Sequence, residues 1–511
     1  MSEIVLTTLN AKYIHASFGL RYLLANMGEL KDRTTMVEFD INQRPLEIVE
    51  RLLALNPKII GFGIYIWNTT QSEEVIALIR RLAPAVKILL GGPEVSFDTG
   101  KQSIVELADY TITGEADQEF GRVCSQILDG AAPTSRVIPA LLPKLADLEL
   151  PYDLYTEEDL SHRVIYVEAS RGCPFTCEFC LSSLDIPVRA FDLDRFLGAM
   201  EGLLQRGAKE FKFVDRTFNL NMRVSEAILE FFLERFFDGL FLHFEMIPDR
   251  LPEGLRELIK KFPPGALQFE VGIQTFNDEV SAHISRRQNY DKMADNFHFL
   301  RGDTGVHIHA DLIVGLPGET LDSFGTGFDR LVKMRPQEIQ IGILKRLKGT
   351  PIIRHDDEFK MIYSPHPPFE ILSNRDLDFA TFQRMRRFAR YWDLVGNSGN
   401  FVSSRELIWA GDRSPFQAFL SFADYLAEKA GRRHGIALTQ LVGFVFGYLT
   451  EMNGVDPELA ASRLLADYQC AGRNDIPLPL RGHISEAARG KDAKAVAGPK
   501  RQSRHAAETV G

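Results

Sequence analysis

Hydrophobic and polar positions in the first 130 residues alternate between two patterns. Short, continuous apolar runs are typical of buried parallel strands, and each is followed by apolar residues that recur at helical spacing. Five β-α units of this length predict a doubly wound, flavodoxin-like α/β sheet with a ligand crevice at the carboxyl ends of its strands. The predicted strands are 4–6, 36–39, 59–64, 86–90 and 110–113.

A second β-α series follows a segment with scattered prolines and acidic residues, 131–163, which we interpret as a linker. Six β-α units fit an open, partial TIM-type (β/α)6 barrel over 164–350, whose functional residues are expected at the carboxyl ends of its strands. The predicted barrel strands are 164–169, 211–214, 242–245, 268–271, 307–310 and 339–342.

Beyond residue 350 the barrel periodicity ends. Apolar residues at helical spacing in 379–392, 416–425 and 438–452 predict a mostly helical C-terminal domain over 351–475. The last segment, 476–511, mixes basic residues with Ala, Gly and acids and predicts a disordered tail. The expected order of domains is therefore sheet (1–130), linker, barrel, helical domain and tail.

Composition excludes several partners. The net charge of −10 and the pI of about 5.7 do not favour nucleic acid. No apolar run is long enough to span a bilayer, and the first residues lead directly into a strand, so neither a membrane segment nor a signal peptide is expected. The small number of cysteines points to a reducing cytoplasm.

Three of the five cysteines, Cys173, Cys177 and Cys180, fall within one short loop. A disulfide framework would need an even count and an oxidising compartment. A structural zinc site would need four ligands, and no Cys or His pair at zinc-finger spacing follows. Three thiolates without a fourth ligand instead suit a 4Fe-4S cluster with one iron left open. Cys124 and Cys470 have no partner in the sequence and are expected to be structural thiols.

The Cys-x-x-x-Cys-x-x-Cys spacing, preceded by Arg-Gly, resembles the signature of the radical S-adenosylmethionine (SAM) superfamily. The resemblance implies that the open iron chelates SAM and that an electron from the cluster cleaves it to a 5′-deoxyadenosyl radical. It also implies SAM contacts next to the cluster and at the ends of the barrel strands. For Glu245 and Asp311, an ion pair at the barrel mouth is an equal alternative. The implied SAM residues are Phe179, Asp215, Arg216, Glu245, Glu270, Gln274, Asp311 and Gly315.

Loops at the carboxyl ends of the N-terminal strands resemble those of the cobalamin-binding domain that precedes many radical SAM domains. Their glycines would let backbone approach the corrin. The Asp-x-His-x-x-Gly motif that supplies a histidine to cobalt is absent, so the resemblance implies base-off cobalamin, with His15 the only nearby candidate ligand. The alternative is a flavodoxin-like module without cobalamin. The implied cobalamin residues are Asn10, Tyr13, His15, Tyr65, Trp67, Asn68, Gly91, Gly92, Pro93, Glu94, Gly114 and Glu115.

Together these resemblances imply a cobalamin-dependent radical SAM enzyme, a methyltransferase that acts on an unactivated carbon through the deoxyadenosyl radical and methylcobalamin. Alternatives are cobalamin-assisted ring formation or rearrangement, and a non-enzymatic cluster or cobalamin sensor. Methylthio transfer to tRNA is less well supported, because the N-terminal half lacks extra cluster cysteines. The expected partners are a small-molecule or peptide substrate and an electron donor such as flavodoxin or ferredoxin.

Overall fold

The computed structural model describes residues 3–185, 187–470, 473–484 and 499–505. The chain divides into two compact units. The first contains residues 1–216, 345–353 and 364–370, and the second contains 217–344, 354–363 and 371–511. This division does not follow the predicted domains, because the first two barrel strands belong to the first unit.

The first unit is built on a parallel sheet with the strand order β2-β1-β3-β4-β5-β6. The order 2-1-3-4-5 is that of a flavodoxin-like doubly wound sheet, which confirms the predicted fold. The sixth strand extends it into the range predicted to be a linker. The strands are β1 (Ile4–Asn10), β2 (Thr34–Asp40), β3 (Ile59–Gly63), β4 (Lys87–Gly91), β5 (Tyr110–Thr113) and β6 (Val137–Pro139).

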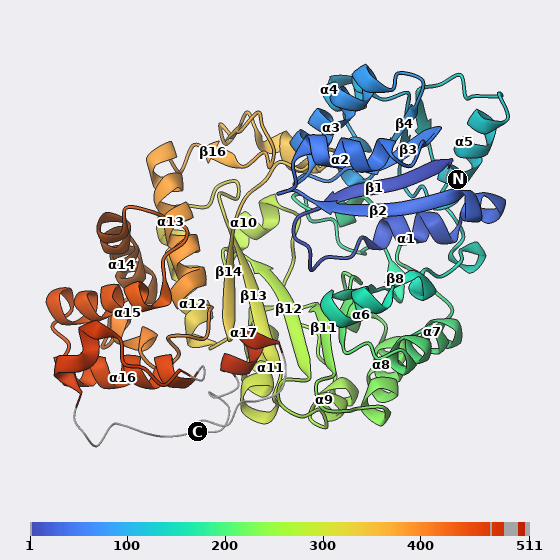
Figure 1. Cartoon of the computed structure of the whole chain (residues 1–511). Coiled ribbons are helices and arrows are strands. Elements are labelled where there is room, and N and C mark those ends of the chain that lie inside the picture. The colour runs from blue at the N-terminus through green and yellow to red at the C-terminus, as the bar shows by residue number, and fades with distance from the viewer. Residues whose placement is uncertain (1–2, 186, 471–472, 485–498, 506–511) are drawn as a thin grey trace. The chain divides into compact units, whose positions relative to one another are not determined.

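Helices cover both faces of this sheet (Figure 1). Apolar side chains of α2, α3 and α4 pack against one face, and those of α1 and α5 pack against the other, so the central strands β1, β3 and β4 are buried on both sides. This explains the continuous apolar runs in the sequence. The helices are α1 (Phe18–Ala25), α2 (Pro45–Leu53), α3 (Thr69–Leu82), α4 (Ser103–Leu107) and α5 (Glu119–Leu128).

The first unit continues into the start of the barrel. A capping box at Thr156 and Asp159 begins a short helix, and the parallel pair β7 and β10 follows on either side of the cysteine loop. The elements are α6 (Glu157–His162), β7 (Ile165–Val167), β8 (Ser170–Arg171), β9 (Arg189–Ala190), α7 (Leu193–Gln205) and β10 (Glu210–Phe213).

The barrel sheet has the strand order β14-β13-β12-β11-β10-β7, so all six predicted barrel strands are present. Its last four strands belong to the second unit and pair in parallel. They are β11 (Phe241–Met246), β12 (Leu267–Gln274), β13 (His307–Val314) and β14 (Glu338–Ile343). The helices between and beside them are α8 (Met222–Glu234), α9 (Glu253–Ile259), α10 (Asp278–His283), α11 (Tyr290–Asp303) and α12 (Leu321–Lys333).

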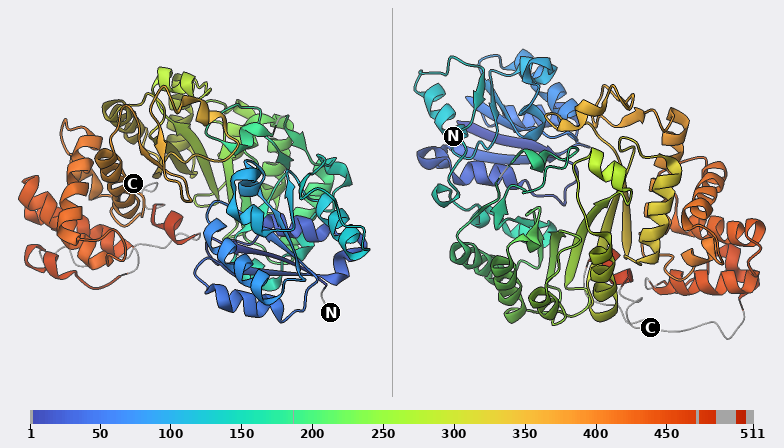
Figure 2. Two further views of the ribbon diagram at one scale, coloured as in Figure 1. Left: turned by 90° about the horizontal axis from the view of Figure 1, so that it is seen from above. Right: turned by 180° about the vertical axis from the view of Figure 1, so that it is seen from behind.

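The rest of the second unit is mainly helical, as predicted. In both views of Figure 2 the helices, coloured orange to red, form a group of their own next to the yellow strands. Asn397 fixes them to β14, because its side chain accepts from the Ile339 N–H and donates to the Ile339 carbonyl. The elements are β15 (Ile362–Tyr363), β16 (Ile371–Ser373), α13 (Phe379–Val395), α14 (Pro415–Ala430), α15 (Leu438–Gly447) and α16 (Pro457–Cys470).

The range 476–511, predicted to be a disordered tail, contains two helices in its described part. They are the 3₁₀ helix η11 (Leu478–His483) and α17 (Lys500–His505). Residues 485–498 and 506–511 lie outside the described residues. Arg501 of α17 forms ion pairs with Glu338 at 2.9 Å and with Asp393 at 2.8 Å. Arg501 is 108 positions from Asp393 and lies still further along the chain from Glu338, so local sequence gave no signal for these contacts.

Within the described part of the chain, no helix is long and apolar enough to cross a membrane.

Candidate active site and cofactor pocket

The cysteine loop is a long excursion between β8 and β9, which pair antiparallel and close it at its base. Cys173 and Cys177 are buried, and Cys180 is half-buried. Burial raises the pKa of the Cys173 thiol, the other two thiols raise it further, and Arg216 opposes this rise. All three thiols therefore belong to one loop that shields them largely from water.

Gly172 allows the loop to close. Its φ is +92°, and a Cβ atom there would lie 2.7 Å from the Asp185 carbonyl oxygen and 2.9 Å from that of Pro187. Only glycine fits such an approach without displacing backbone. The Cys173 N–H then donates to the Asp185 carbonyl at 3.0 Å, which joins the two ends of the loop.

Arg171, which precedes this glycine, ties the cysteine loop to the first sheet. Its guanidinium lies 2.9 Å from Glu168, 2.8 Å from Glu115 and 3.0 Å from Asp117, and stacks over the Tyr22 ring. Burial raises the pKa of Glu168 to about 7, although Arg171 opposes the shift. The Arg of the Arg-Gly pair thus has a structural role that the sequence did not indicate.

The three cysteines, which the sequence predicts to bind a 4Fe-4S cluster, are not placed to hold a single metal ion. Among the described residues, no three His, Cys, Asp or Glu side chains are placed to hold one ion. A cluster makes no such demand, because each thiolate binds a different iron. Of the other cysteines, Cys124 lies on the buried face of α5 and Cys470 is exposed in the second unit. The loop itself therefore offers three ligands for four irons.

Asp215 follows β10 and is buried beside the strand that leads into the cysteine loop. One carboxylate oxygen accepts from the Ala169 N–H at 3.0 Å, and the other accepts from the Ser170 hydroxyl at 2.6 Å. Burial raises the pKa of Asp215 to about 6. Both oxygens therefore have partners in the residues just before the loop, and the SAM contact that the resemblance implied for Asp215 stays a prediction.

We expect Asp215→Asn to reduce the iron content. One side-chain oxygen becomes an NH2 group, so a buried donor loses its acceptor at a cost of about 1–3 kcal/mol. The Ala169–Ser170 backbone then shifts, and the cysteine loop shifts with it. Iron per chain after anaerobic reconstitution measures this effect.

Ser170→Ala, which removes only one of the two contacts, should lose less iron and is the matched control. If Asp215 instead serves SAM, Asp215→Asn will keep its iron and bind SAM about tenfold or more weakly.

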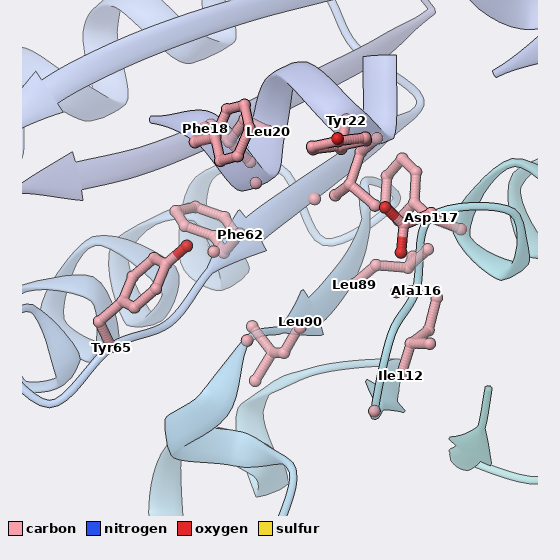
Figure 3. A pocket seen from close by; sticks show the side chains of 18 of the residues that line it. Phe18, Leu20, Tyr22, Phe62, Tyr65, Leu89, Leu90, Ile112, Ala116 and Asp117 are labelled. Atoms are coloured by element: carbon pink, nitrogen blue, oxygen red, sulfur yellow. The ribbon is translucent and has the colours of Figure 1, made fainter. Parts of the chain in front are cut away.

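A cavity of about 270 Å³ lies at the carboxyl ends of β3, β4 and β5, on the face covered by α1 and α5. Figure 3 shows Phe18, Leu20 and Tyr22 of α1 across from Leu89, Leu90 and Ile112 of the strands. Glycines 61, 63, 91, 92 and 114 form much of its edge, so backbone is exposed to whatever occupies it. Its lining also includes Glu168 and Arg171, immediately before the cysteine loop.

Of the twelve residues predicted for cobalamin, four line this cavity: Tyr65, Gly91, Gly92 and Gly114. The sequence missed Phe18, Tyr22, Asp117, Glu168 and Arg171. Phe18 and Tyr22 are aromatic residues on a helix that was recognised only by its apolar spacing. Their four-residue separation, which places both on one face, was the available signal.

Several other predicted residues have structural partners. The Asn68 amide donates to the Leu9 and Gly63 carbonyls, and the Asn10 amide donates to Glu38. Glu94 pairs with Lys348 at 2.6 Å, and Glu115 pairs with Arg171 and Arg189. These contacts brace the loops between strands and helices.

The remaining predicted cobalamin residues lie towards the surface. Trp67 stacks on Tyr65 with ring centroids 4.5 Å apart, and Pro93 is exposed. Tyr13 is exposed and donates to Glu158, while Arg163 lies over its ring. His15 Nδ1 lies 2.6 Å from the Tyr166 hydroxyl, so one ring nitrogen already has a partner.

The backbone of Gly92 requires glycine whether or not cobalamin binds there. Its φ is +106°, and an added Cβ would lie 2.5 Å from the Ile64 carbonyl oxygen. The predicted contact of Gly92 with cobalamin stays a prediction. At Gly91, by contrast, the nearest atom to an added Cβ is the Ile112 oxygen, 3.7 Å away.

In the second unit, strand register brings two predicted SAM residues together. Glu245 of β11 lies level with Glu270 of β12, which lies level with His309 of β13. Glu270 also contacts His243 Nε2 at 3.0 Å. Glu270 therefore has a partner on the neighbouring strand, and the SAM contacts of Glu245 and Glu270 stay predictions.

Two other predicted SAM residues of this unit, Gln274 and Gly315, have positive φ angles. Gln274 has φ +72° next to a bulge in the pairing of β12 with β13. A non-glycine residue in this region carries backbone strain, which is common at functional sites. Gly315 has φ +95°, and an added Cβ would lie 2.8 Å from the Phe382 ring. Packing of α13 therefore accounts for this glycine.

Two predicted SAM residues belong to the first unit. Of these, Phe179 is half-buried and Arg216 is exposed.

His309 lies between two carboxylates, 3.3 Å from Asp311 Oδ1 and 3.5 Å from Glu338 Oε2. Burial alone would lower its pKa, but the two carboxylates raise the pKa of His309 to about 10. Glu338 also accepts from His307 and pairs with Arg501, and its pKa is held well below the usual range although burial opposes this. The sequence did not identify His309 or Glu338.

We expect His309 to make the second unit less stable at alkaline pH. Because its pKa rises on folding, its contribution to the free energy of unfolding is complete below pH 6.5, falls as pH rises towards 10 and is absent above. The urea midpoint of tryptophan fluorescence should fall over this window, and His309→Gln should flatten the fall. The exposed His298→Gln change should leave it intact. An unchanged slope in His309→Gln would show that the imidazole is not charged at neutral pH.

Three family models match the chain. The B12 binding domain matches residues 4–123, the Radical SAM superfamily matches 167–330, and a protein of unknown function, DUF4080, matches 357–503. The chain is a cobalamin-binding radical SAM protein. These matches confirm the predicted fold class and agree with the prediction of SAM and cobalamin as cofactors, whereas the predicted domain bounds stay predictions.

Curated relatives are distant. The cobalamin-dependent radical SAM methyltransferase TokK of Streptomyces tokunonensis is 22% identical over 347 residues, which cover 57% of this chain and 47% of TokK. The ribosomal protein uS12 methylthiotransferase RimO of Pelobacter propionicus is 25% identical over 245 residues, covering 46% of this chain and 53% of RimO. The chain thus spans about half the length of the curated relatives it matches.

Two solved structures share the fold. The radical SAM methyltransferase TsrM from Kitasatospora setae, with cobalamin and a [4Fe-4S] cluster bound, superposes with a TM-score of 0.57 at 17% identity. The match covers 69% of this chain and 74% of TsrM. The cobalamin-dependent radical enzyme OxsB gives 0.60 at 12% identity, covering 91% of this chain and 78% of OxsB. At these identities the likeness establishes the fold alone.

Proposed function

We propose that this radical SAM enzyme is a cobalamin-dependent methyltransferase that acts on an unactivated carbon. The observation that carries the proposal is the position of Glu168 and Arg171. Both line the cavity at the carboxyl ends of the first sheet, and both immediately precede the loop that carries Cys173. Residues 168–173 thus connect the cavity, where we place cobalamin, to the loop, where we place the 4Fe-4S cluster.

The cavity is too small for a corrin ring but has the size and apolar walls for the flat base at the end of the cobalamin nucleotide. Leu20, Leu89 and Ile112 would contact its faces, and Tyr65 offers an aromatic edge. The corrin would then lie outside this cavity, against Gly91 and Gly114, whose missing side chains leave space. The absence of the Asp-x-His-x-x-Gly motif from the sequence supports a cobalt without a protein histidine.

The cysteine loop would hold the 4Fe-4S cluster through Cys173, Cys177 and Cys180. Once bound, the cluster supplies the electron that cleaves SAM. The chain's part is to place these groups and exclude water, because a carbon radical must meet its target before it is quenched. Phe179 beside the loop, and Glu245, Glu270 and Asp311 on the barrel strands, remain our candidates for SAM contacts.

A substrate-free experiment separates the alternatives. Anaerobically reconstituted protein is given cobalamin, a chemical reductant and SAM labelled in its methyl group. We expect labelled methylcobalamin and unlabelled 5′-deoxyadenosine. Deoxyadenosine without label on cobalamin would favour ring formation or rearrangement. Bound cobalamin with neither product would favour a sensor and overturn the proposed activity.

Methylthio transfer, the activity named for the RimO relatives, is less well supported. Residues 1–172 contain one cysteine, Cys124, and it lies on the buried face of α5. Burial raises the pKa of its thiol to well above the usual range, so it is a poor cluster ligand.

The partners that we propose are a small-molecule or peptide substrate and an electron donor such as flavodoxin or ferredoxin.

A further inference from the structure

A second cavity, of about 320 Å³, lies in the second unit at the amino end of β14. Its walls come from the end of α12, the start of β14, one side of α13 and the loop before α14. The barrel residues predicted for SAM lie at the carboxyl ends of the strands, so this cavity is at the opposite end of β14 from the barrel mouth. Nothing in the proposed methyltransferase site uses it.

The rim of this cavity is strongly basic. Lys333, Arg335, Arg405 and Arg413 line it, against one carboxylate, Glu406. Within the part of the chain that the structure describes, neither Lys333 nor Arg335 has an ion-pair partner, although both are exposed and close to the same opening. Four cations around one small hollow repel one another, and an anion between them would relieve that repulsion.

The floor of the cavity is aromatic. Trp392 and Trp409 both line it, with ring centroids 6.0 Å apart and planes inclined by 30°. Trp392 is 3% exposed and its indole nitrogen is itself buried, so it presents only a small apolar part of its ring. Trp409 is half-buried and presents more of its ring to the cavity. The two indoles together suit a flat apolar group.

We propose that this cavity binds a small anion that carries a planar ring, with a phosphate or carboxylate group at the basic rim. The half-buried indole of Trp409, with Ile339 and Pro336, provides the apolar surface for the ring. The volume is at the lower end of the range for small-molecule sites, which suits a single ring and excludes a dinucleotide. Arg335 and Arg405 supply planar guanidinium groups, which match phosphate and carboxylate oxygens in pairs.

Such a ligand would act on the C-terminal helices. It would contact Lys333 and Ile339 on the barrel side of the cavity, and Trp392 and Arg405 on the helical side. It would therefore hold α13 against β14, as the Asn397 side chain already does. Binding should therefore stabilise the second unit. This consequence does not depend on methyl transfer, because it involves neither the cysteine loop nor the cavity of the first sheet.

Calorimetry on the full-length, cluster-loaded protein tests the proposal. Saturating SAM is present, so that the barrel mouth is occupied. The probes are phenyl phosphate, benzoate, inorganic phosphate and phenol. We expect saturable binding of phenyl phosphate or benzoate, at least tenfold weaker binding of inorganic phosphate, and no binding of phenol. If neither phenyl phosphate nor benzoate binds, the proposal is overturned. If inorganic phosphate binds as tightly as they do, the ring is not needed. If phenol binds as tightly, the negative charge is not needed.

Fluorescence locates the binding. The chain has three tryptophans, and two of them line this cavity, so a Trp67→Phe protein reports on Trp392 and Trp409 alone. The ring anion should change this emission with the same saturation curve as the heat. A heat signal without an emission change would place the binding elsewhere and refute this site.

Arg335→Asn is the decisive variant. Arg335 is exposed and has φ +56°, a conformation that asparagine tolerates, so the fold should survive the change. Loss of one charged contact should weaken the ring anion about tenfold. The matched control is Arg463→Asn, an exposed arginine outside the cavity, which should bind as the unmodified chain does. Equal weakening in both variants would mean that general charge, and not this cavity, attracts the anion.

Discussion

Replacing Cys177 with alanine is expected to abolish formation of 5′-deoxyadenosine. Cys177 is buried. The hydrogen bond from the Cys173 N–H to the Asp185 carbonyl, together with the tight backbone approach at Gly172, closes the loop that carries it. Removing one of three ligands leaves an iron without a protein thiolate, and the cluster is then lost or unable to cleave SAM. Iron content, absorption near 400 nm and deoxyadenosine from SAM and a reductant together measure this result.

Cys470→Ala is the control for that experiment. Cys470 is exposed at the end of α16 in the second unit, so removing its sulfur should change neither iron content nor SAM cleavage. Cys124→Ala should also keep its iron, at the cost of a small cavity beneath α5. Full SAM cleavage by Cys177→Ala would refute the assignment of the loop as the cluster site.

The sequence predicted the layout of the chain better than the role of single residues. Buried parallel strands require continuous apolar runs, and the spacing between runs requires helices, so both sheets could be predicted from periodicity. The strand β6 was missed because it has three residues and ends in Pro139, which marks it as an edge strand. Local patterns also gave no signal for α17, whose contacts with Glu338 and Asp393 are distant in sequence.

Residue roles were harder to predict because a glycine or a carboxylate at a strand end has several uses. Gly92 avoids the Ile64 carbonyl, and Gly315 avoids the Phe382 ring, although both positions also suit a bound cofactor. Asp215 is bonded to Ala169 and Ser170, a contact that only the fold reveals. The cysteines were different, because three thiols at fixed spacing in one short loop have few other uses.

Replacing Gly91 with valine is expected to weaken cobalamin binding at least tenfold while leaving the iron unaffected. Gly91 ends β4 at the edge of the cavity in the first sheet, and an added Cβ would meet no atom closer than 3.7 Å. The side chain is therefore tolerated by the protein, and its two methyl groups occupy space in a cavity of about 270 Å³. Cobalamin retained after incubation under reducing conditions and gel filtration is the measurement, with iron per chain determined on the same sample.

The choice of Gly91 over Gly92 makes this experiment interpretable. Gly92→Val places a Cβ 2.5 Å from the Ile64 carbonyl oxygen in a backbone conformation that L residues rarely adopt, so it disrupts the loop whether or not cobalamin binds there. Gly100→Val is the matched control, since nothing lies within 4 Å of a Cβ at Gly100 and it does not line the cavity. If Gly91→Val and Gly100→Val bind cobalamin equally well, the cavity is not the cofactor site. If the unmodified chain takes up none, the first sheet is a scaffold, and the methyltransferase proposal fails with it.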